Sequence, residues 1–335
     1  MKPFRSLLAQ IYAMLAKWRV KAYQKGFFQK HKINIPVVSV GNLTFGGTGK
    51  TPVTEFLMRL LIEKGQRPGI ACRAYKARRK KVQRINPRYD QAHDVGDEAL
   101  MMARRFPQSP VYSGLKKWQV AEAISQNERI NVLILDDGFQ HLALERNLDI
   151  VLLDANEKPE NYLCFPMGRA REPWSALRRG QLIFLTKCNL ASPENLEFHR
   201  QQLQGLEVFE FKYTVGGFEN FKGQKASKIN FKKALLVSAI AKPKSFQTLI
   251  QNEFPGLTIE SLIFPDHHRF RHQDLVKIRK RMNQGFDCIL VTEKDFVKLK
   301  DLRSAKELPI WQVQLELQPD FSVESLYAKL HPIFI

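Results

Sequence analysis

A glycine-rich segment around residue 46 constrains the fold of this chain more than any other feature. A β-branched run at residues 37–40 leads into Gly41 and then into TFGGTGKT at residues 44–51, and a helical pattern follows at residues 52–63. A strand, a glycine-rich loop and a helix in this order are typical of a P-loop, in which backbone N–H groups and the helix N-terminus bind phosphate. The segment therefore predicts a nucleotide-binding α/β protein, although Thr44 stands where the motif usually has its first glycine.

The chemistry of a P-loop assigns roles to these residues. The lysine reaches the β- and γ-phosphates, the following hydroxyl binds Mg²⁺, and a proline fits the first helical turn, where its missing N–H costs nothing. Lys50, Thr51 and Pro52 occupy these positions. We expect the nucleotide to be bound by eight consecutive residues, Thr44, Phe45, Gly46, Gly47, Thr48, Gly49, Lys50 and Thr51.

Two carboxylates follow another strand candidate. Residues 132–135 read Val-Leu-Ile-Leu, as in a buried parallel strand, and Asp136 and Asp137 come directly after it. Ligands of α/β sheets bind at the carboxyl ends of strands, and a P-loop kinase or ATPase needs a carboxylate there to hold its metal. The pair predicts a metal site, with capping of the next helix as the alternative for either residue alone.

Further apolar runs predict the rest of the sheet, at residues 69–72, 150–153, 182–186, 235–238 and 288–292. Most are separated by helical patterns, which favours a P-loop NTPase-like, doubly wound, mostly parallel α/β sheet. Residues 216–230 are rich in Gly, Lys and Asn and resemble a linker. We therefore expect a P-loop core at residues 36–215 and a smaller C-terminal α/β domain at residues 216–335, with strands at 208–215 and 311–317 pairing between them.

Positive charge is concentrated at the N-terminus. The formal net charge is +20, and no acidic residue precedes Glu55. Within residues 1–35, apolar side chains recur at helical spacing from Leu7 to Trp18, a pattern typical of an amphipathic helix on an anionic membrane surface. The apolar stretch is too short to span a bilayer, which takes about 20 residues. A helix that packs on its own domain is the alternative. A signal peptide is disfavoured, because basic residues stand where a signal peptide has the small residues of its cleavage site.

A second basic run, at residues 73–88, has the composition of an exposed loop and is expected to steer an anionic ligand if it lies near the phosphate site. The chain has no zinc-finger or RNA-binding signature and no aromatic residues interleaved with the bases, so nucleic acid is not expected as a partner. The four cysteines form no CxxC pair, which indicates a reduced, cytosolic setting.

Several motifs together resemble one enzyme family. Besides TFGGTGKT, the chain contains VGDE at residues 95–98, DDGFQH at 136–141, RAREP at 169–173, FPDHH at 264–268 and TEKD at 292–295. This set, over about residues 5–300, resembles the tetraacyldisaccharide 4′-kinases. The resemblance implies an ATP-dependent kinase that phosphorylates the 4′ hydroxyl of tetraacyldisaccharide 1-phosphate in lipid A biosynthesis, bound peripherally to the cytoplasmic face of the bacterial inner membrane and expected to be a monomer.

The same resemblance implies residue roles. Asp97 would be the catalytic base and His267 its partner, brought together when the two domains close; Lys50 and Arg171 would stabilise the transferring phosphoryl group. Thr51, Asp136, Asp137 and Glu98 would hold Mg²⁺. The chain departs from the family pattern at residues 72–75, 165–173 and 239–240, which bears on substrate contacts and not on the reaction.

Two other functions remain open at this point. A P-loop GTPase or metal-insertion ATPase is the first, but the Thr186-Lys187 pair matches only half of a guanine-reading motif, which would need an Asp two residues after the lysine. The second is a membrane tether whose nucleotide site is regulatory. Nucleotide preference and lipid-dependent release of ADP would separate these from a lipid kinase.

Overall fold

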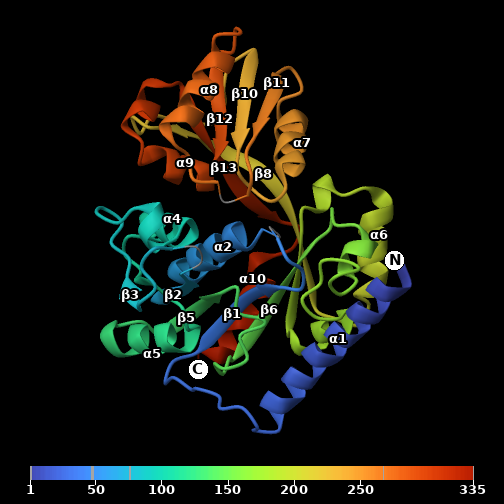
Figure 1. Cartoon of the computed structure of the whole chain (residues 1–335). Helices are drawn as coiled ribbons and strands as arrows, with labels where there is room; N and C mark the ends of the chain where they lie inside the picture. The colour runs from blue at the N-terminus through green and yellow to red at the C-terminus, as the bar shows by residue number, and fades with distance from the viewer. Residues whose placement is uncertain (1, 47–48, 75–76, 267, 335) are drawn as a thin grey trace.

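The structure is a computed structural model that describes residues 2–46, 49–74, 77–266 and 268–334. Within these residues, the strands form a 13-stranded sheet in the order β11-β10-β12-β13-β8-β7-β6-β1-β5-β2-β4-β3, with β9 paired to β8. The described pairs are parallel except for β13–β8, β3–β4 and β8–β9. The predicted α/β architecture with a mostly parallel sheet is therefore confirmed (Figure 1).

The larger unit contains the P-loop. Its strands are β1 (Val37–Asn42), β2 (Pro68–Arg73), β3 (Gln83–Arg84), β4 (Val111–Gly114), β5 (Val132–Asp136), β6 (Leu148–Asp154), β7 (Leu182–Thr186) and the first part of β8 (Val208–Asn220). Its helices are α1 (Lys2–Gln24), α2 (Lys50–Glu63), α3 (Ala92–Val95), α4 (Asp97–Arg105), α5 (Lys117–Asn127) and α6 (Pro193–Gln202). The strands expected at 37–40, 69–72, 132–135, 150–153 and 182–186 are confirmed.

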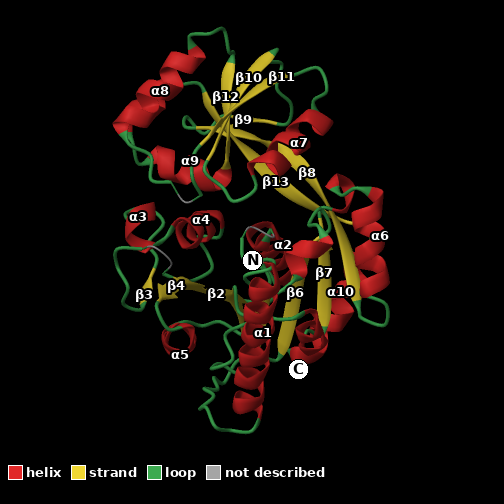
Figure 2. Cartoon of the chain, turned by 45° about the vertical axis from the view of Figure 1, so that its right-hand side comes forward, coloured by secondary structure: helices red, strands yellow, loops and turns green. Residues whose placement is uncertain are grey.

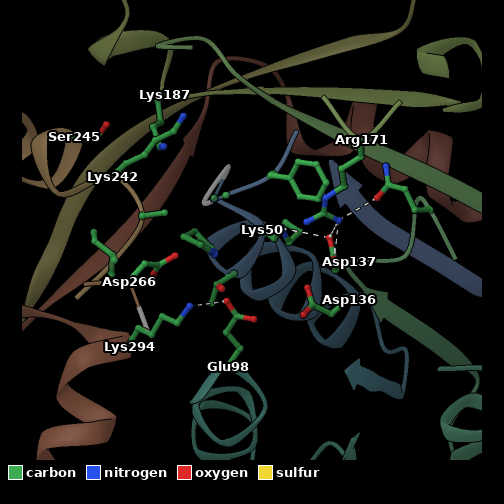
Figure 3. Close-up of a pocket in the computed structure, with 18 of the residues that line it drawn as sticks. Lys50, Glu98, Asp136, Asp137, Arg171, Lys187, Lys242, Ser245, Asp266 and Lys294 are labelled. Carbon is green, nitrogen blue, oxygen red and sulfur yellow. Dashed lines mark hydrogen bonds and ion pairs between the residues drawn. The ribbon is translucent and has the colours of Figure 1, made fainter. Parts of the chain in front are cut away.

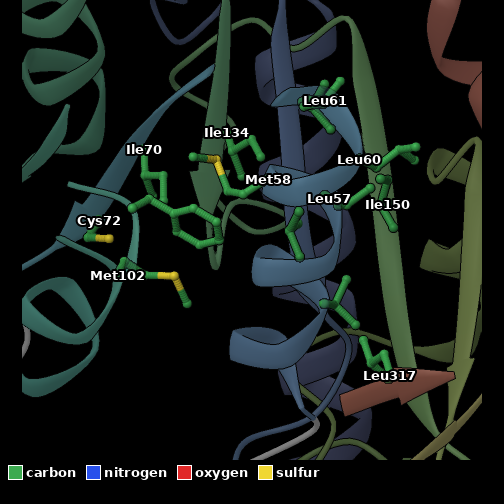
Figure 4. Close-up of a cluster of buried hydrophobic side chains, with 14 of the residues drawn as sticks. Leu57, Met58, Leu60, Leu61, Ile70, Cys72, Met102, Ile134, Ile150 and Leu317 are labelled. Carbon is green, nitrogen blue, oxygen red and sulfur yellow. The ribbon is translucent and has the colours of Figure 1, made fainter. Parts of the chain in front are cut away.

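Alternating side chains of the central strands bury both faces of this sheet. Val38 and Ile134 share one buried cluster with Leu57 and Leu61 of α2, whereas Val37 and Leu133 face α5 on the other side. Figure 4 shows α2 packed on the sheet in this way. The fixed position of α2 on β1 places the P-loop between them at the carboxyl edge of the sheet.

The smaller unit continues the same sheet. It contains β9 (Lys225–Ala226), β10 (Lys233–Ser238), β11 (Thr258–Ile263), β12 (Cys288–Thr292) and β13 (Ile310–Pro319), with helices α7 (Pro243–Glu253), α8 (His272–Met282) and α9 (Glu293–Lys300). Helices α8 and α9 cover one face of β10 and β12, and α7 covers the other. Figure 2 shows this unit above the P-loop unit.

The connection between the units is a pair of long strands. β8 pairs in parallel with β7 at its start and then antiparallel with β13, where Leu315 lies opposite Val215 and Trp311 opposite Asn220. The pairing of 208–215 with 311–317 was predicted, but Gly216 and Gly217 lie inside β8 and not in a linker.

The chain returns to the P-loop unit after β13. The final α-helix, α10 (Val323–Leu330), buries Leu326 and Leu330 in the same cluster as α2. A division at residue 216 would assign α10 to the smaller unit. However, the apolar face of α10 packs on the larger unit, because β13 carries the chain back along β8. The predicted division into a core at residues 36–215 and a smaller domain at residues 216–335 stays a prediction.

Helix α1 lies along the side of the P-loop unit (Figure 2). Only Ala9 and Ala22 are buried among its described side chains, while Met14 and Trp18 are 62% and 60% exposed. None of the helices in the described part of the chain has both the length and the apolar character to cross a membrane.

Candidate active site

The P-loop connects the carboxyl end of β1 to the N-terminus of α2. Gly49 precedes the helix with φ 86°, a left-handed conformation that glycine adopts without steric penalty. Lys50 and Thr51 are consequently the first two residues of α2. Thr44 is buried below the loop, and Gly47 and Thr48 lie outside the described residues.

A second segment, at residues 169–171, runs beside the loop. The Phe45 N–H donates to the Arg169 carbonyl at 2.7 Å, and the Arg171 N–H donates to the Leu43 carbonyl at 2.8 Å. These backbone bonds place the Arg171 guanidinium 5.2 Å from the centre of the Phe45 ring. The structure therefore brings Arg171 to the P-loop.

A cavity of about 990 Å³ contains most of the predicted site. It extends from the inner side of α1, through the P-loop, to the smaller unit. Figure 3 shows the part of the cavity between the P-loop and the smaller unit. The residues that matter for its chemistry are Tyr12, Leu15 and Arg19 from α1, Phe45, Gly46, Gly49, Lys50, Thr51, Arg73, Glu98, Asp136, Asp137 and Arg171 from the P-loop unit, and Lys242, Phe246, Asp266 and Lys294 from the smaller one.

Asp137 is the centre of the ion pairs in this cavity. Lys50 Nζ lies 3.4 Å from its Oδ1, and Arg171 Nη1 donates to both carboxylate oxygens at 3.0 and 3.2 Å. Burial raises the pKa of Asp137, but the cations of Lys50, Lys117 and Arg171 together hold it well below its usual value. The carboxylate is therefore ionised at neutral pH and fixes both Lys50 and Arg171.

Asp136 has a different environment. Burial, together with the charge of Glu98, raises the pKa of Asp136 to about 6. Burial also acts on Glu98, yet Lys294 and Lys50 lower the pKa of that carboxyl, and Lys294 Nζ donates to its Oε1 at 3.0 Å. Because the charge of Glu98 raises the pKa of Asp136, a cation near both carboxylates would offset the repulsion between them.

These oxygens fit a magnesium ion. Among the described residues, no three His, Cys, Asp or Glu side chains come close enough to hold a metal by themselves. Mg²⁺ commonly uses only one or two carboxylates together with water and substrate phosphates. Thr51, Glu98 and Asp136 all line the phosphate end of the cavity. Together they supply two carboxylates and one hydroxyl, which agrees with this preference.

The predicted base is directed toward a neighbouring space. Asp97 begins α4 and lines a second cavity of about 580 Å³, and its Oδ2 lies 3.5 Å from Lys298 Nζ. The next residue, Glu98, lines the first cavity. His267 lies outside the described residues, so its pairing with Asp97 stays a prediction.

The basic run at residues 73–88 is mostly exposed, as predicted. Arg73 lines the first cavity, and Arg78 lines the second. Others are engaged by acids on the surface: Arg79 pairs with Asp90 at 2.7 Å, and Arg84 pairs with Glu128 at 3.0 Å. Among the described residues of the run, only Arg73 therefore reaches the predicted phosphate site.

Sequence reasoning missed a buried ion cluster at the border between the units. Asp154 ends β6 and accepts hydrogen bonds from Lys187 Nζ at 2.6 Å and Lys242 Nζ at 2.7 Å; Lys242 also pairs with Glu157. Lys187, which matched half of a guanine-reading motif, is thus committed to Asp154. An Asp at the carboxyl end of a strand beside β1 was the signal that could have identified this cluster.

Gln140 was also missed as a connecting residue. Its Nε2 donates to the Asn42 carbonyl at 3.0 Å, its Oε1 accepts from Arg171 at 3.2 Å, and its carbonyl accepts from Arg19 at 2.9 Å. The position of Gln140 within DDGFQH was the available signal. Through the carbonyl and the side chain of this residue, helix α1 is joined to the arginine beside the P-loop.

Comparison with known proteins gives a consistent result. A family model described as tetraacyldisaccharide-1-P 4′-kinase matches residues 1–332. The tetraacyldisaccharide 4′-kinase of Bdellovibrio bacteriovorus is 36% identical over 323 residues, covering 95% of each chain, and that of Desulfotalea psychrophila is 35% identical over 319 residues, covering 92% of this chain and 90% of the relative. The crystal structure of "apo" form LpxK from Aquifex aeolicus in complex with ATP superposes with a TM-score of 0.78 at 26% identity, covering 99% of this chain and 98% of the other.

Proposed function

The chain belongs to the tetraacyldisaccharide 4′-kinase family, and from this membership we propose which of its residues carry the reaction. It is an ATP-dependent kinase of lipid A biosynthesis, and the GTPase, metal-insertion and tether alternatives are set aside. The observation that carries the residue assignments is the single cavity that holds Lys50, Arg171 and the carboxylates of Glu98, Asp136 and Asp137.

The residues of the P-loop, Thr44–Thr51, bind the phosphates of ATP. Lys50 and Arg171 supply the positive charge that stabilises the transferring phosphoryl group. Both are held by Asp137, with Lys50 also 3.2 Å from Asn42 Oδ1. Asp137 thus acts by orienting the two cations, which is the role that its ion pairs favour over the direct metal contact expected from the sequence.

Thr51, Glu98 and Asp136 would hold Mg²⁺. When bound, the ion would supply positive charge that offsets the charge of the phosphates and of the leaving group. The raised pKa of Asp136, to about 6, supports this assignment, because a nearby cation removes the repulsion between this carboxylate and Glu98.

Asp97 accepts the proton of the 4′ hydroxyl, and His267 orients and tunes that carboxylate. A positioned carboxylate near a hydroxyl nucleophile contributes roughly 10²- to 10⁴-fold to a rate. Lys298 near Asp97 and Lys294 on Glu98 come from the same helix, α9 of the smaller unit. This contact supports an active site that is completed at the border between the two units.

The lipid that accepts the phosphoryl group approaches from the α1 end of the cavity. Leu15 and Tyr12 line the cavity there, while Met14 and Trp18 of the same helix are 62% and 60% exposed. A helix with basic residues and a free apolar face is suited to the interface of an anionic membrane. We place the enzyme, as a monomer, on the cytoplasmic face of the inner membrane, where a phosphorylated lipid can enter the cavity without leaving the bilayer.

The test measures transfer of a second phosphate to tetraacyldisaccharide 1-phosphate in detergent micelles with Mg-ATP. We expect Lys50→Ala and Asp97→Asn to lower kcat by at least about 10²-fold, with Asp97→Asn retaining ATP binding. The matched controls are Lys64→Ala, directly after the same helix, and Asp320→Asn, since both residues form pairs on the protein surface.

Each result decides one role. Normal turnover by Asp97→Asn would show that Asp97 is not the base, and normal turnover by Lys50→Ala would overturn the P-loop assignment. A loss of activity in the control variants as large as in these two would show that the assay reports protein damage and not the loss of a catalytic group.

A further inference from the structure

Lys117 is a buried cation that the proposed mechanism does not use. It is the first residue of α5, it is 3% exposed, and it comes from a part of the chain with no recognised motif. Burial of an ammonium group is costly, and the positive end of a helix dipole opposes a cation at this position. A lysine held here against both effects must make strong compensating contacts.

The contacts are with the backbone of the acidic pair. Lys117 Nζ donates to the carbonyl of Asp136 at 2.6 Å and to the carbonyl of Asp137 at 2.5 Å. Two of its three N–H groups thus bind consecutive carbonyls of one turn, and the side chain does not extend to the wall of the 990 Å³ cavity. It therefore reaches the site only through the residues that it binds.

The turn needs such support. Asp137 has φ 52°, in the left-handed region that a residue with a Cβ rarely adopts. This conformation lets the carbonyls of Asp136 and Asp137 converge on one donor, while the Asp137 carboxylate points to Lys50 and Arg171 on the other side. Lys117 thus holds the backbone carbonyls of this turn, while Lys50 and Arg171 hold the Asp137 carboxylate on the other side.

We infer that Lys117 is a positioning residue for the kinase reaction: it fixes the Asp136-Asp137 turn, so that one carboxylate orients Lys50 and Arg171 and the other faces Glu98. The inference rests on the proposed roles of those acids. Loss of a group that orients metal-binding or catalytic side chains without touching substrate commonly costs about 10- to 100-fold in activity or metal affinity.

The experiment compares Lys117→Met, which keeps most of the length of the side chain and removes its donors, with Lys116→Met, the exposed neighbour. We measure kcat, the KM for ATP and the melting temperature. The fourth quantity is the Mg²⁺ concentration at which the Mg²⁺-dependent increase in ATP affinity is half complete. Lys117→Met is expected to lower kcat about 10- to 100-fold and to raise the required Mg²⁺ several-fold, with the KM for saturating Mg-ATP within about threefold of wild type. Lys116→Met should match wild type in all four measurements.

Two results would overturn the inference. A Lys117→Met enzyme with a lower melting temperature but normal kcat and normal Mg²⁺ dependence would show that the lysine only stabilises the fold. A raised KM for ATP at unchanged kcat would show direct contact with the nucleotide.

Two further variants keep the outcome decidable. If Lys117→Met does not fold, Lys117→Gln, which is neutral and shorter, is judged by the same criteria. Asp136→Asn tests the proposed metal site, on which the inference rests. Full activity in that variant would contradict the metal site. An inactive Asp136→Asn together with a fully active Lys117→Met would contradict only the role of Lys117.

Discussion

Gly49 shows how a single backbone conformation fixes the phosphate loop. Its φ of 86° is left-handed, its carbonyl accepts from the Tyr213 hydroxyl at 3.3 Å, and a Cβ at this position would overlap that hydroxyl. Tyr213 is buried on β8, so it has little room to move. Gly65 has a similar φ of 77° but open space around it.

The two glycines therefore predict different outcomes for the same substitution. Gly65→Ala should cost about 1–2 kcal/mol of stability, the usual penalty for a side chain in this conformation, and leave ATP affinity unchanged. Gly49→Ala should cost at least as much and also weaken ATP binding by about tenfold or more, because relieving the overlap displaces the loop. Titration of ATP binding with parallel thermal unfolding tests this; equal ATP affinity in both variants would contradict it.

Residues of the site differ in how far the sequence could identify them. Lys50, Thr51 and Asp136 stand in local motifs whose chemistry depends on a few neighbouring positions, so they could be predicted. Gln140 and Lys117 act through contacts that exist only after folding: Gln140 meets Asn42 across 98 positions, and Lys117 meets Asp136 across 19. No local pattern encodes such pairs.

Strands could be predicted from the sequence where the run of hydrophobic residues was long. β1, β5, β6 and β7 are continuously buried and read as apolar runs. β11 was missed because it lies at the sheet edge, where its side chains are only partly buried and polar residues interrupt the run. β4 was missed because its four buried residues, Val-Tyr-Ser-Gly, include no run of aliphatic side chains.

Three helices meet at a buried cluster that sequence patterns did not reveal. Glu55 of α2 lies 3.7 Å from Arg105 of α4, and Arg105 lies 2.5 Å from Glu293 of α9. Burial, with a further contribution from Glu293, raises the pKa of Glu55 to about 8. The cluster links the P-loop helix, α2, to α4 and α9, which both contribute charged residues to the site.

This shift predicts a pH-dependent stability. The unfolded chain releases the Glu55 proton near pH 4.3, whereas the folded protein keeps it up to about pH 8, so the folded state binds more protons between these values. Stability contributed by this group is therefore complete below about pH 4 and is lost as pH rises toward 8, with a slope of at most about 1.4 kcal/mol per pH unit. Glu55→Gln cannot ionise and should lack this loss.

The melting temperature of Glu55→Gln relative to wild type should consequently increase between pH 6 and pH 8. Glu63→Gln, at an exposed position on the same helix, is the control and should keep a constant difference from wild type over this range. A difference for Glu55→Gln that stays constant or declines with pH would mean that Glu55 is ionised in the folded protein.

At the scale of the whole molecule, charge and apolar surface coincide on α1. The net charge of +20 includes Lys17 and Lys21 on this helix, and both are exposed, as is the apolar Trp18 between them. Arg19 is different, because its guanidinium donates to the Gln140 carbonyl at 2.9 Å and so joins the helix to the active site. The sequence predicted one basic surface, whereas the structure divides it between the exterior and the cavity.

Membrane attachment can therefore be tested without disturbing the site. A lysine near an anionic leaflet contributes about 1 kcal/mol, so Lys17→Gln with Lys21→Gln should weaken binding to vesicles rich in phosphatidylglycerol by about 30-fold and leave turnover in detergent micelles unchanged. Lys222→Gln with Lys225→Gln removes the same charge from exposed positions of the smaller unit and should change binding little. Equal losses in both double variants would assign attachment to overall charge, while lost turnover in micelles from the α1 variant would show that these lysines also act at the site.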